Sequence, residues 1–203
     1  MTFTKRLFDI CAALALLLIL WPLVIWLSAL ILIRDGRPVL YLSERMKTPT
    51  QGFLLWKFRT MTVVAQDTGV SGGHKASRIT RTGAFLRKYR LDEIPQLWNV
   101  LRGDISFVGP RPPLRRYVEQ FPKLYGEVLK SRPGITGMAT LVYHRHEEVL
   151  LAECGSAEET EDVYRRRCVP QKARLDLIYQ ARRSLCLDVV LMLKTVFRRI
   201  KIH

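Results

Sequence analysis

Apolar and charged positions are strongly segregated along the 203-residue chain. Residues Ile10 to Ile33 form a run of 24 residues without a charged side chain. A helix of that length would be about 36 Å long, which is enough to cross the hydrocarbon core of a membrane. The run is too long for the apolar part of a secretion signal, and no small-residue cleavage site follows it. The pattern therefore predicts a membrane-embedded helix. The alternative, a core helix, would need a larger protein to cover every face.

The same segment has a proline near its middle and cations at both ends. Pro22 removes one backbone hydrogen bond and predicts a kink. Lys5 and Arg6 precede the apolar run, and Arg34 and Arg37 follow it. Because positive charge favours the cytoplasmic side, this symmetry leaves two topologies open. Either a kinked helix spans the membrane, or a re-entrant helix-break-helix hairpin returns both ends to the cytoplasmic face.

The rest of the chain has both strand and helix patterns. Residues 51–61 predict a strand with Lys57 and Arg59 on one face. Residues 67–77, rich in Gly and Ser, predict a loop. From Leu185 to Ile200 apolar residues recur at helical spacing and basic residues follow, so this segment is either an amphipathic helix on anionic lipid or an ordinary core helix. Further helices are expected at about 83–89, 95–101, 117–132 and 171–183.

Composition adds a large positive charge, with 33 Lys and Arg against 18 Asp and Glu and a net charge of +15. The first 33 residues hold only Lys5, Arg6 and Asp9, a net +1, which leaves +14 on residues 34–203. Such an excess indicates an anionic partner: nucleic acid, a phosphorylated substrate or a membrane surface. A hydrophobic content of 48% excludes a disordered basic tail. The four cysteines include no C-x-x-C pair, which excludes a disulfide scaffold or zinc ribbon and indicates reduced thiols.

Two adjacent carboxylates are the strongest candidates for chemistry. Asp92 and Glu93 precede Pro95, which suits the first turn of a helix, so both are expected at a helix N-terminus. Alone, the pair could serve only as a helix cap. Cations flank it on both sides, however, and carboxylates among cations suit a divalent metal with a phosphate chain. An Asp carboxylate is also a competent nucleophile toward phosphorus. The flanking cations are Arg87, Lys88, Arg90, Arg102 and Arg111.

Two further cationic features are candidates for phosphate binding. Arg111 stands between Pro110 and Pro112, so its guanidinium is presented with little backbone freedom and suits bidentate contact with a phosphate. The same segment could also be a structural surface turn. Lys57 and Arg59 form a second pair, for which a solvated strand face is the alternative.

Several motifs, in this order, resemble the bacterial sugar transferase family, the small monotopic polyprenyl-phosphate phosphoglycosyl transferases. The resemblance covers nearly the whole chain. One departure is Met138, where many members have Trp. The motifs are Lys5-Arg6 with Asp9, Pro22, Lys57–Met61, Arg78–Arg81, Leu91–Asp104, Phe107–Pro112 and Arg132–Gly137.

The resemblance implies an α+β, membrane-associated fold. Residues 1–35 would form a re-entrant hairpin broken at Pro22, with both ends on the cytoplasmic face of the bacterial inner membrane. Residues 36–203 would form a small mixed α/β catalytic domain with amphipathic helices on the anionic inner leaflet. The implied reaction moves a sugar-1-phosphate from a UDP-sugar to a polyprenyl phosphate, normally undecaprenyl phosphate, and releases UMP. This is the first membrane step of glycoconjugate or exopolysaccharide synthesis.

The resemblance also implies residue roles. Asp92 would attack the β-phosphorus and carry the phosphosugar in a ping-pong scheme, and Glu93 would ligate Mg²⁺. Such a scheme admits two mutually repelling anions to one cationic pocket in turn. The implied phosphate-binding residues are Lys57, Arg59, Arg78, Arg87 and Arg111. Peripheral candidates are Gln96, Asn99 and Asp176.

Two other classes of function fit the charge: a membrane-anchored nucleic-acid-binding protein and a non-catalytic scaffold. The sequence contains no nucleic-acid motif, and its cations cluster with carboxylates instead of forming a stripe. The Asp92-Glu93 pair argues against a scaffold. An oligomer is compatible with the sequence. Among sugars, UDP-linked N-acetylhexosamines or di-N-acetyl sugars are favoured, with glucose and galactose left open.

Overall fold

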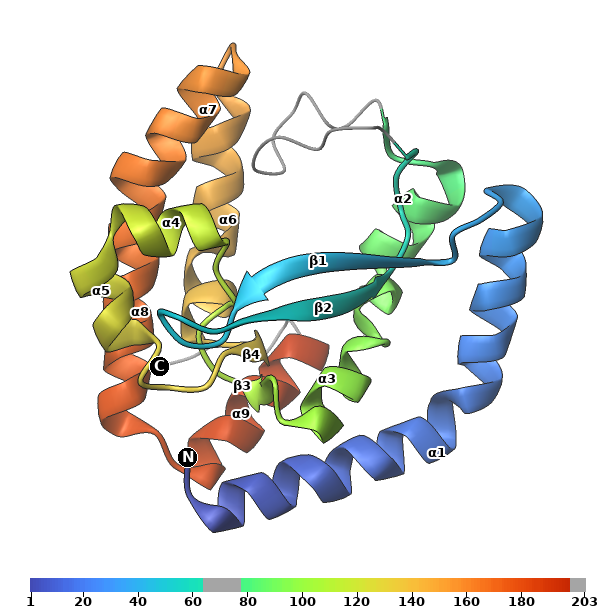
Figure 1. The fold of residues 1–203 in the computed structure, drawn as a ribbon, viewed down its shortest axis with the longest axis horizontal. Helices are drawn as coiled ribbons and strands as arrows, with labels where there is room; N and C mark the ends of the chain where they lie inside the picture. The colour runs from blue at the N-terminus through green and yellow to red at the C-terminus, as the bar shows by residue number, and fades with distance from the viewer. Residues whose placement is uncertain (64–77, 198–203) are drawn as a thin grey trace.

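A computed structural model describes residues 1–63 and 78–197. The loop expected at 67–77 and Ile200 lie outside the described residues. Within them, a long helix, α1 (Phe3–Arg34), extends along two sides of a mixed α/β domain (Figure 1). The mixed helix and strand content predicted for the chain is confirmed.

Helix α1 is bent but continuous. The Thr2 side chain accepts a hydrogen bond from the backbone N–H of Lys5 and caps its first turn. The helix then continues through Pro22 to Arg34, and a bend is visible near its middle (Figure 1). The bend is what an internal proline predicts, because the ring clashes with the preceding turn. The expected break into two separate helices is not present.

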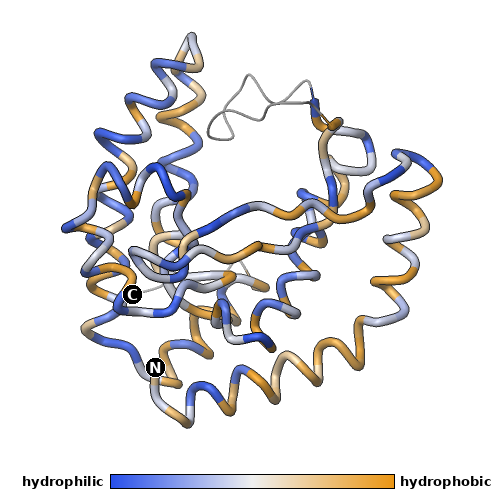
Figure 2. The backbone as a smooth tube through the Cα atoms, viewed as in Figure 1, coloured by the Kyte–Doolittle hydropathy of each residue, from blue (hydrophilic) through white to orange (hydrophobic). Residues whose placement is uncertain are grey.

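One face of α1 packs on the domain and the opposite face is exposed. Ala13, Leu27 and Ile31 are fully buried, whereas the side chains of Leu18 and Ile33 are 76% and 83% exposed. Figure 2 shows hydrophobic residues along most of α1 and hydrophilic residues at its two ends. By length and composition this helix could cross a membrane, and only 11% of its most apolar window is buried. Its exposure does not fit a core helix.

Two small sheets lie inside the arc of α1. The strands β1 (Leu40–Met46) and β2 (Gly52–Phe58) form an antiparallel hairpin in which Tyr41 pairs with Lys57. The strands β3 (Ser106–Val108) and β4 (Gly134–Thr136) pair in parallel. The hairpin confirms the strand expected near residues 51–61, but β2 ends at Phe58.

Short helices connect and cover these sheets. Between β2 and β3 lie α2 (Arg81–Lys88), the 3₁₀ turn η2 (Leu91–Glu93) and α3 (Gln96–Arg102). Between β3 and β4 lie α4 (Arg115–Gln120) and α5 (Pro122–Val128). After β4 come α6 (Met138–Ala152), α7 (Ala157–Val163), the π-helical turn η3 (Tyr164–Cys168), α8 (Val169–Arg182) and α9 (Leu185–Val196).

The single helix expected over residues 117–132 is wrong in one respect, because two helices occupy this segment. Helix α4 ends before Phe121, and α5 begins at Pro122. A proline has no N–H to donate and restricts the residue before it, so it suits the first turn of a new helix and not the interior of one.

Two apolar clusters attach the two halves of α1 to the same domain. In the first, Ala13 of α1 packs with buried residues of α3, β3, α8 and α9, among them Val100 and Tyr179. In the second, Leu27 and Ile31 of α1 pack with Phe58 of β2 and Leu86 of α2. The beginning and the end of α1 are therefore both fixed to one folded unit.

Helix α9 exposes the apolar face that its sequence pattern defines. Val189, Leu193 and Val196 are exposed, Val196 to 74%. The residues that α9 buries are Asp188, Leu191 and Lys194. The apolar face is thus not the core-facing one, which argues against an ordinary core helix and leaves a hydrophobic surface without a partner among the described residues.

Candidate functional site

Asp92 and Glu93 lie in η2, a single turn between α2 and α3. The turn follows Arg90, a non-glycine residue in the left-handed region with φ of 56°. Such a conformation is sparsely populated and is retained where the surrounding structure requires it, often at functional sites. The N-cap of α3 is Pro95, and no side chain caps this helix. The two carboxylates therefore do not serve as the helix cap that their position allowed.

Lys57 joins the two carboxylates. Its Nζ donates a hydrogen bond to Glu93 Oε1 at 3.0 Å and lies 3.9 Å from Asp92 Oδ2. Arg111 Nη2 lies 3.7 Å from the same Glu93 oxygen. Residues from β2, η2 and the segment after β3 thus converge on one polar site.

The site gives its two carboxyl groups different acidities. Burial raises the pKa of Asp92 above its ordinary value, and the charge of Lys57 offsets this only in part. Burial also acts on Glu93, but the charges of Lys57 and Arg111 outweigh it and lower the pKa of Glu93 to about 2. Burial lowers the pKa of Lys57, and Glu93 opposes that shift. Neighbouring carboxyls with separated pKa values are typical of groups with different catalytic roles.

The other predicted phosphate-binding cations are not all at this site. Arg87 is near enough for its charge to lower the pKa of Asp92, and its Nε donates to Thr60 Oγ1 at 2.9 Å. Arg59 is buried elsewhere. It follows the end of β2, and its guanidinium donates to the backbone carbonyls of Asp35, Gly36 and Arg37 at 2.5–3.1 Å. Arg59 therefore fixes the turn after α1 and does not share a face with Lys57.

Arg78 and Gln96 are the two remaining candidates, one before η2 in the chain and one after it. Arg78 Nη2 donates to the carbonyl of Thr62 at 3.4 Å. Gln96 is buried in the first turn of α3.

Asn99 positions the site through the backbone. It is fully buried, its Oδ1 accepts a hydrogen bond from the N–H of Trp56, and its Nδ2 donates to the carbonyl of Leu54. These bonds hold β2, which carries Lys57, against α3, which follows the carboxylate pair. Asn99 thus has a structural reason to occupy this position without touching a substrate.

Asp176 is a buried carboxyl on α8. Its Oδ1 has no hydrogen-bond partner among the described residues. Burial raises its pKa to about 7, while Lys172 and the backbone N–H of Ala139 oppose the shift. The group is therefore partly protonated near neutral pH.

The raised pKa of Asp176 predicts that the free energy of unfolding depends on pH. Its folded-state pKa is raised, so the folded chain binds this proton more tightly than the unfolded chain and loses stability as pH rises from 3.8 to about 7. Between pH 5 and pH 8 the loss should be about 3 kcal/mol. Asp176→Asn should remove it and give a flatter profile of melting temperature against pH than wild type, whereas Asp162→Asn, an exposed control, should not. Equal slopes for wild type and Asp176→Asn would contradict the burial argument.

Arg45 is a further cation on the face of the hairpin that carries Lys57, and the sequence analysis did not identify it. It lies on β1 on the same face as Tyr41, which pairs with Lys57. Burial lowers the pKa of Arg45, and the neighbouring charge of Arg111 adds to the effect. The alternation of side chains along β1 puts Arg45 on the same face as Tyr41, but only the register of the hairpin shows that Arg45 and Lys57 share a face.

Arg111 is positioned by a close crossing of backbones that the sequence analysis also missed. The Gly109 N–H donates to the Thr136 carbonyl at 2.9 Å, and the Gly134 N–H donates to the Pro110 carbonyl at 2.8 Å. A Cβ atom added to Gly109 or Gly134 would lie 2.2 Å from backbone of the facing segment. These glycines permit the contact that holds Arg111 at the site.

The residues that the structure describes include no group of three or more His, Cys, Asp and Glu side chains that could hold a metal. Asp92 and Glu93 are two adjacent carboxylates. Mg²⁺ is commonly held by one or two carboxylates together with water and substrate phosphates. The donor set therefore fits a magnesium ion shared with a diphosphate, and not a metal cage formed by the protein alone.

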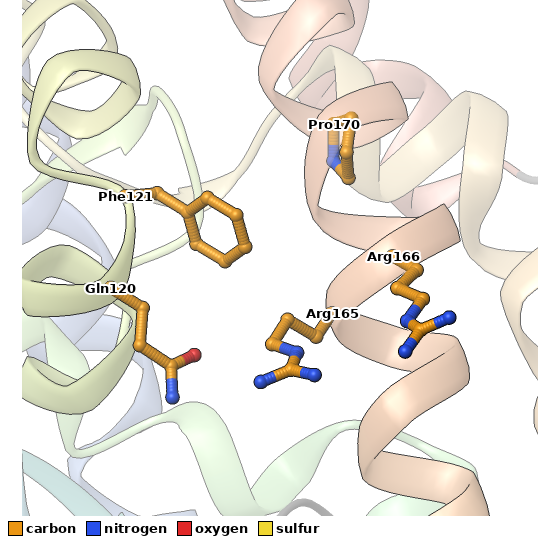
Figure 3. Close-up of a pocket in the computed structure, with 5 residues that line it drawn as sticks. All are labelled: Gln120, Phe121, Arg165, Arg166 and Pro170. Atoms are coloured by element: carbon orange, nitrogen blue, oxygen red, sulfur yellow. The ribbon is translucent and has the colours of Figure 1, made fainter.

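A surface pocket lies apart from Asp92 and Glu93. It has a volume of about 440 Å³ and lies between the α4–α5 junction and the η3–α8 segment. Figure 3 shows Phe121 and Gln120 on one side, with Arg165, Arg166 and Pro170 on the other. Both arginines pair with Asp162 at 2.9 Å, and none of the residues around Asp92 lines this pocket. We therefore do not assign the chemistry to it.

The profile of the bacterial sugar transferase family matches residues 1–201. The chain belongs to this family. It is 34% identical over 200 residues to a UDP-N-acetylgalactosamine-undecaprenyl-phosphate N-acetylgalactosaminephosphotransferase from Aeromonas hydrophila, covering 96% of this chain and 43% of the relative. It is 33% identical over 198 residues to a UDP-glucose:undecaprenyl-phosphate glucose-1-phosphate transferase from Klebsiella pneumoniae, covering 96% and 39%.

A third relative is closer to this chain in length. The exopolysaccharide production protein ExoY from Rhizobium meliloti (strain 1021) is 36% identical over an alignment of 150 residues that covers 66% of each protein. The chain thus spans about two fifths of the length of the first two relatives.

Proposed function

We propose that this chain transfers a sugar-1-phosphate from a UDP-sugar to a polyprenyl phosphate, giving a polyprenyl-diphosphate-sugar and UMP. The observation that carries the proposal is the buried pair Asp92 and Glu93, with separated pKa values, between the cations Lys57 and Arg111. The names of the Aeromonas and Klebsiella relatives describe this kind of transfer. Synthesis of an exopolysaccharide or another glycoconjugate is the matching role.

Asp92 is the proposed nucleophile. Its carboxylate oxygen forms a bond to the β-phosphorus of the UDP-sugar, the bond from that phosphorus to the bridging oxygen breaks, and UMP leaves with the electron pair. An oxygen of the polyprenyl phosphate then attacks the same phosphorus, and the bond to Asp92 breaks to restore the carboxylate. Lys57 and Arg111, which pair with Glu93, are the proposed cations for the phosphates, with Arg87, whose charge acts on Asp92, as a third.

Glu93 is the proposed ligand for Mg²⁺, with Asp92 adjacent to it. When bound, the ion would offset the charge of the diphosphate and so ease the departure of UMP. The low pKa of Glu93 keeps this carboxylate ionised at physiological pH and therefore ready to bind a cation. Lys57 and Arg111 would also offset the negative charge of the diphosphate.

Release of UMP tests the proposal directly. The full chain in detergent or nanodiscs would be incubated with Mg²⁺, undecaprenyl phosphate and a panel of UDP-sugars that includes N-acetylhexosamines, a di-N-acetyl sugar, glucose and galactose. We expect multiple turnovers of UMP with at least one sugar, and a lipid-linked sugar diphosphate as the second product. If correctly folded wild-type protein released no UMP with any sugar of the panel, the proposed activity would be ruled out.

We also propose that α1 enters and leaves the membrane on one face, the cytoplasmic one. The start of α1 is bonded to the domain, because Arg6 Nη1 donates to the Val100 carbonyl at 2.6 Å. Its end is bonded to the same domain, because Arg59 donates to the Asp35 carbonyl. A straight spanning helix would place these ends about 30 Å apart on opposite sides of the hydrocarbon. The cations at both ends fit this arrangement.

Cysteine labelling distinguishes the two topologies. Thr4→Cys and Arg37→Cys would be introduced singly into a chain whose four native cysteines are replaced by serine. We expect an impermeant maleimide to label both positions in inverted membrane vesicles and neither in intact cells. Labelling of one position from each side would show a spanning helix instead.

A further inference from the structure

A second cavity lies where α1, α8 and α9 meet, away from the carboxylate pair. It has a volume of about 150 Å³. Its lining includes Lys5 from α1, Ser131 and Arg132 before β4, and Arg183 and Ser184 from the turn between α8 and α9. None of the four residues Asp92, Glu93, Lys57 and Arg111 lines it. The proposed transfer reaction therefore does not account for this cavity.

The cavity has an excess of positive charge. Lys5 forms an ion pair with Asp188, which also lines the cavity, and these two charges balance. Arg132 and Arg183 have no carboxylate within ion-pair distance in the described residues. Arg183 Nη1 lies 3.5 Å from Ser131 Oγ. Ser184 Oγ accepts the N–H of Leu187 as the N-cap of α9. Two guanidinium groups and the hydroxyl protons of Ser131 and Ser184 thus remain to donate to an anion.

The position of Arg132 makes an anion favourable. Burial lowers the pKa of Arg132 and the positive charge of Arg6 lowers it further, while the charges of Asp9 and Asp104 offset the shift only in part. The guanidiniums of Arg6 and Arg132 both lie against Gly103, where α3 ends. A Cβ atom added to Gly103 would lie 3.2 Å from Arg6 Nη2 and 3.3 Å from Arg132 Nη1. An anion beside Arg132 would relieve the repulsion between two close cations. A guanidinium also matches the geometry of a phosphate through paired hydrogen bonds.

The cavity lies at the origin of two exposed apolar surfaces. Helices α1 and α9 both begin beside it, and Figure 1 shows the N-terminus next to the start of α9. Beyond this point α1 exposes Phe3 and Leu7, and α9 exposes Val189 and Leu193. A charged cavity followed by apolar surface matches the order of groups in a phospholipid, a phosphate and then acyl chains.

We propose that this cavity binds the phosphodiester headgroup of an anionic membrane phospholipid, with Arg132 and Arg183 on the phosphate and the exposed faces of α1 and α9 beside the acyl chains. Two unpaired guanidiniums favour a headgroup with a net negative charge over a zwitterionic one. The polyprenyl phosphate must reach Asp92, so it is a different ligand at a different place. The inference requires a membrane-embedded α1 and does not depend on the transfer reaction.

The test uses the full chain in detergent micelles, titrated with dioleoylphosphatidylglycerol while the melting temperature is followed. The cavity variant is Arg132→Gln with Arg183→Gln. The matched control is Arg174→Gln with Arg182→Gln, which removes the same charge from exposed positions of α8. We expect the lipid to stabilise wild type and control alike, and the cavity variant to lose at least about tenfold in apparent affinity. Equal affinity in all three proteins would overturn the proposal.

Three further arms identify the ligand and guard against a misfolded variant. Arg183→Gln alone changes an exposed side chain and should give a partial loss of affinity, so a wild-type affinity there counts against the site. Dioleoylphosphatidylcholine should stabilise the protein far less than the anionic lipid. Inorganic phosphate or undecaprenyl phosphate that binds the cavity more tightly than phosphatidylglycerol would refute the phospholipid assignment. UMP release is read separately, so a failure of the transfer reaction is distinguished from a failure at this cavity.

Discussion

Asp92→Asn should reduce UMP release by about a thousandfold or more, because the substitution removes the nucleophile and leaves an amide that does not attack phosphorus. Asn is close to Asp in size, so the buried turn η2 should keep its fold. The loss should appear both with and without the polyprenyl phosphate acceptor, since the first half-reaction is the step removed. The measurement is UMP released per enzyme, with the wild type run alongside.

The same variant separates a covalent mechanism from direct transfer. Incubation of wild type with UDP-sugar alone should give a mass increase of one phosphosugar on the peptide that contains Asp92, and Asp92→Asn should show none. Asp162→Asn serves as the control, because Asp162 is a half-exposed carboxylate that pairs with Arg165 and Arg166 and not with Lys57 or Arg111. Turnover of Asp92→Asn at the wild-type rate, or an adduct on Glu93, would refute the assigned nucleophile.

The identity of the candidate site residues was more predictable than their geometry. Adjacent carboxylates flanked by cations make Asp92, Glu93, Lys57 and Arg111 candidates, and the family resemblance implies their roles. The structure brings these four residues together. Arg59 shows the limit, since period-2 alternation predicts a shared face only while the strand lasts, and β2 ends at Phe58.

Long-range pairing accounts for what the sequence did not disclose. Arg45 shares a face with Lys57 only through the register of the β1–β2 hairpin. The Gly109–Gly134 contact depends on a parallel pairing between two strands whose partner residues are 28 positions apart along the chain. Neither relation has a local signature in composition or periodicity. The course of α1 is similar, because the symmetric flanking charges left two topologies open. The family resemblance implies the re-entrant one, and the contacts at both ends of α1 support that proposal.

Gly109→Ala should strongly destabilise the fold. The new Cβ atom would lie 2.2 Å from the Arg132 carbonyl and 3.0 Å from the Gly134 nitrogen, which are backbone atoms of a paired strand segment and cannot turn aside. We expect a loss of about 3 kcal/mol or more, a large part of the stability of an ordinary domain. Arg111, two residues further on, should lose its position, so residual folded protein should also release UMP more slowly.

Gly126→Ala is the matched control for this prediction, since it makes the same chemical change within a helix. Gly126 lies in α5, and a Cβ atom there meets nothing within 4 Å. Alanine is the better helix former by up to about 1 kcal/mol, so this variant should melt at or slightly above the wild-type temperature. Thermal unfolding of the three proteins in the same detergent gives the comparison. If Gly109→Ala melted with Gly126→Ala, the close crossing would not constrain the fold, and the rigid presentation of Arg111 would need another cause.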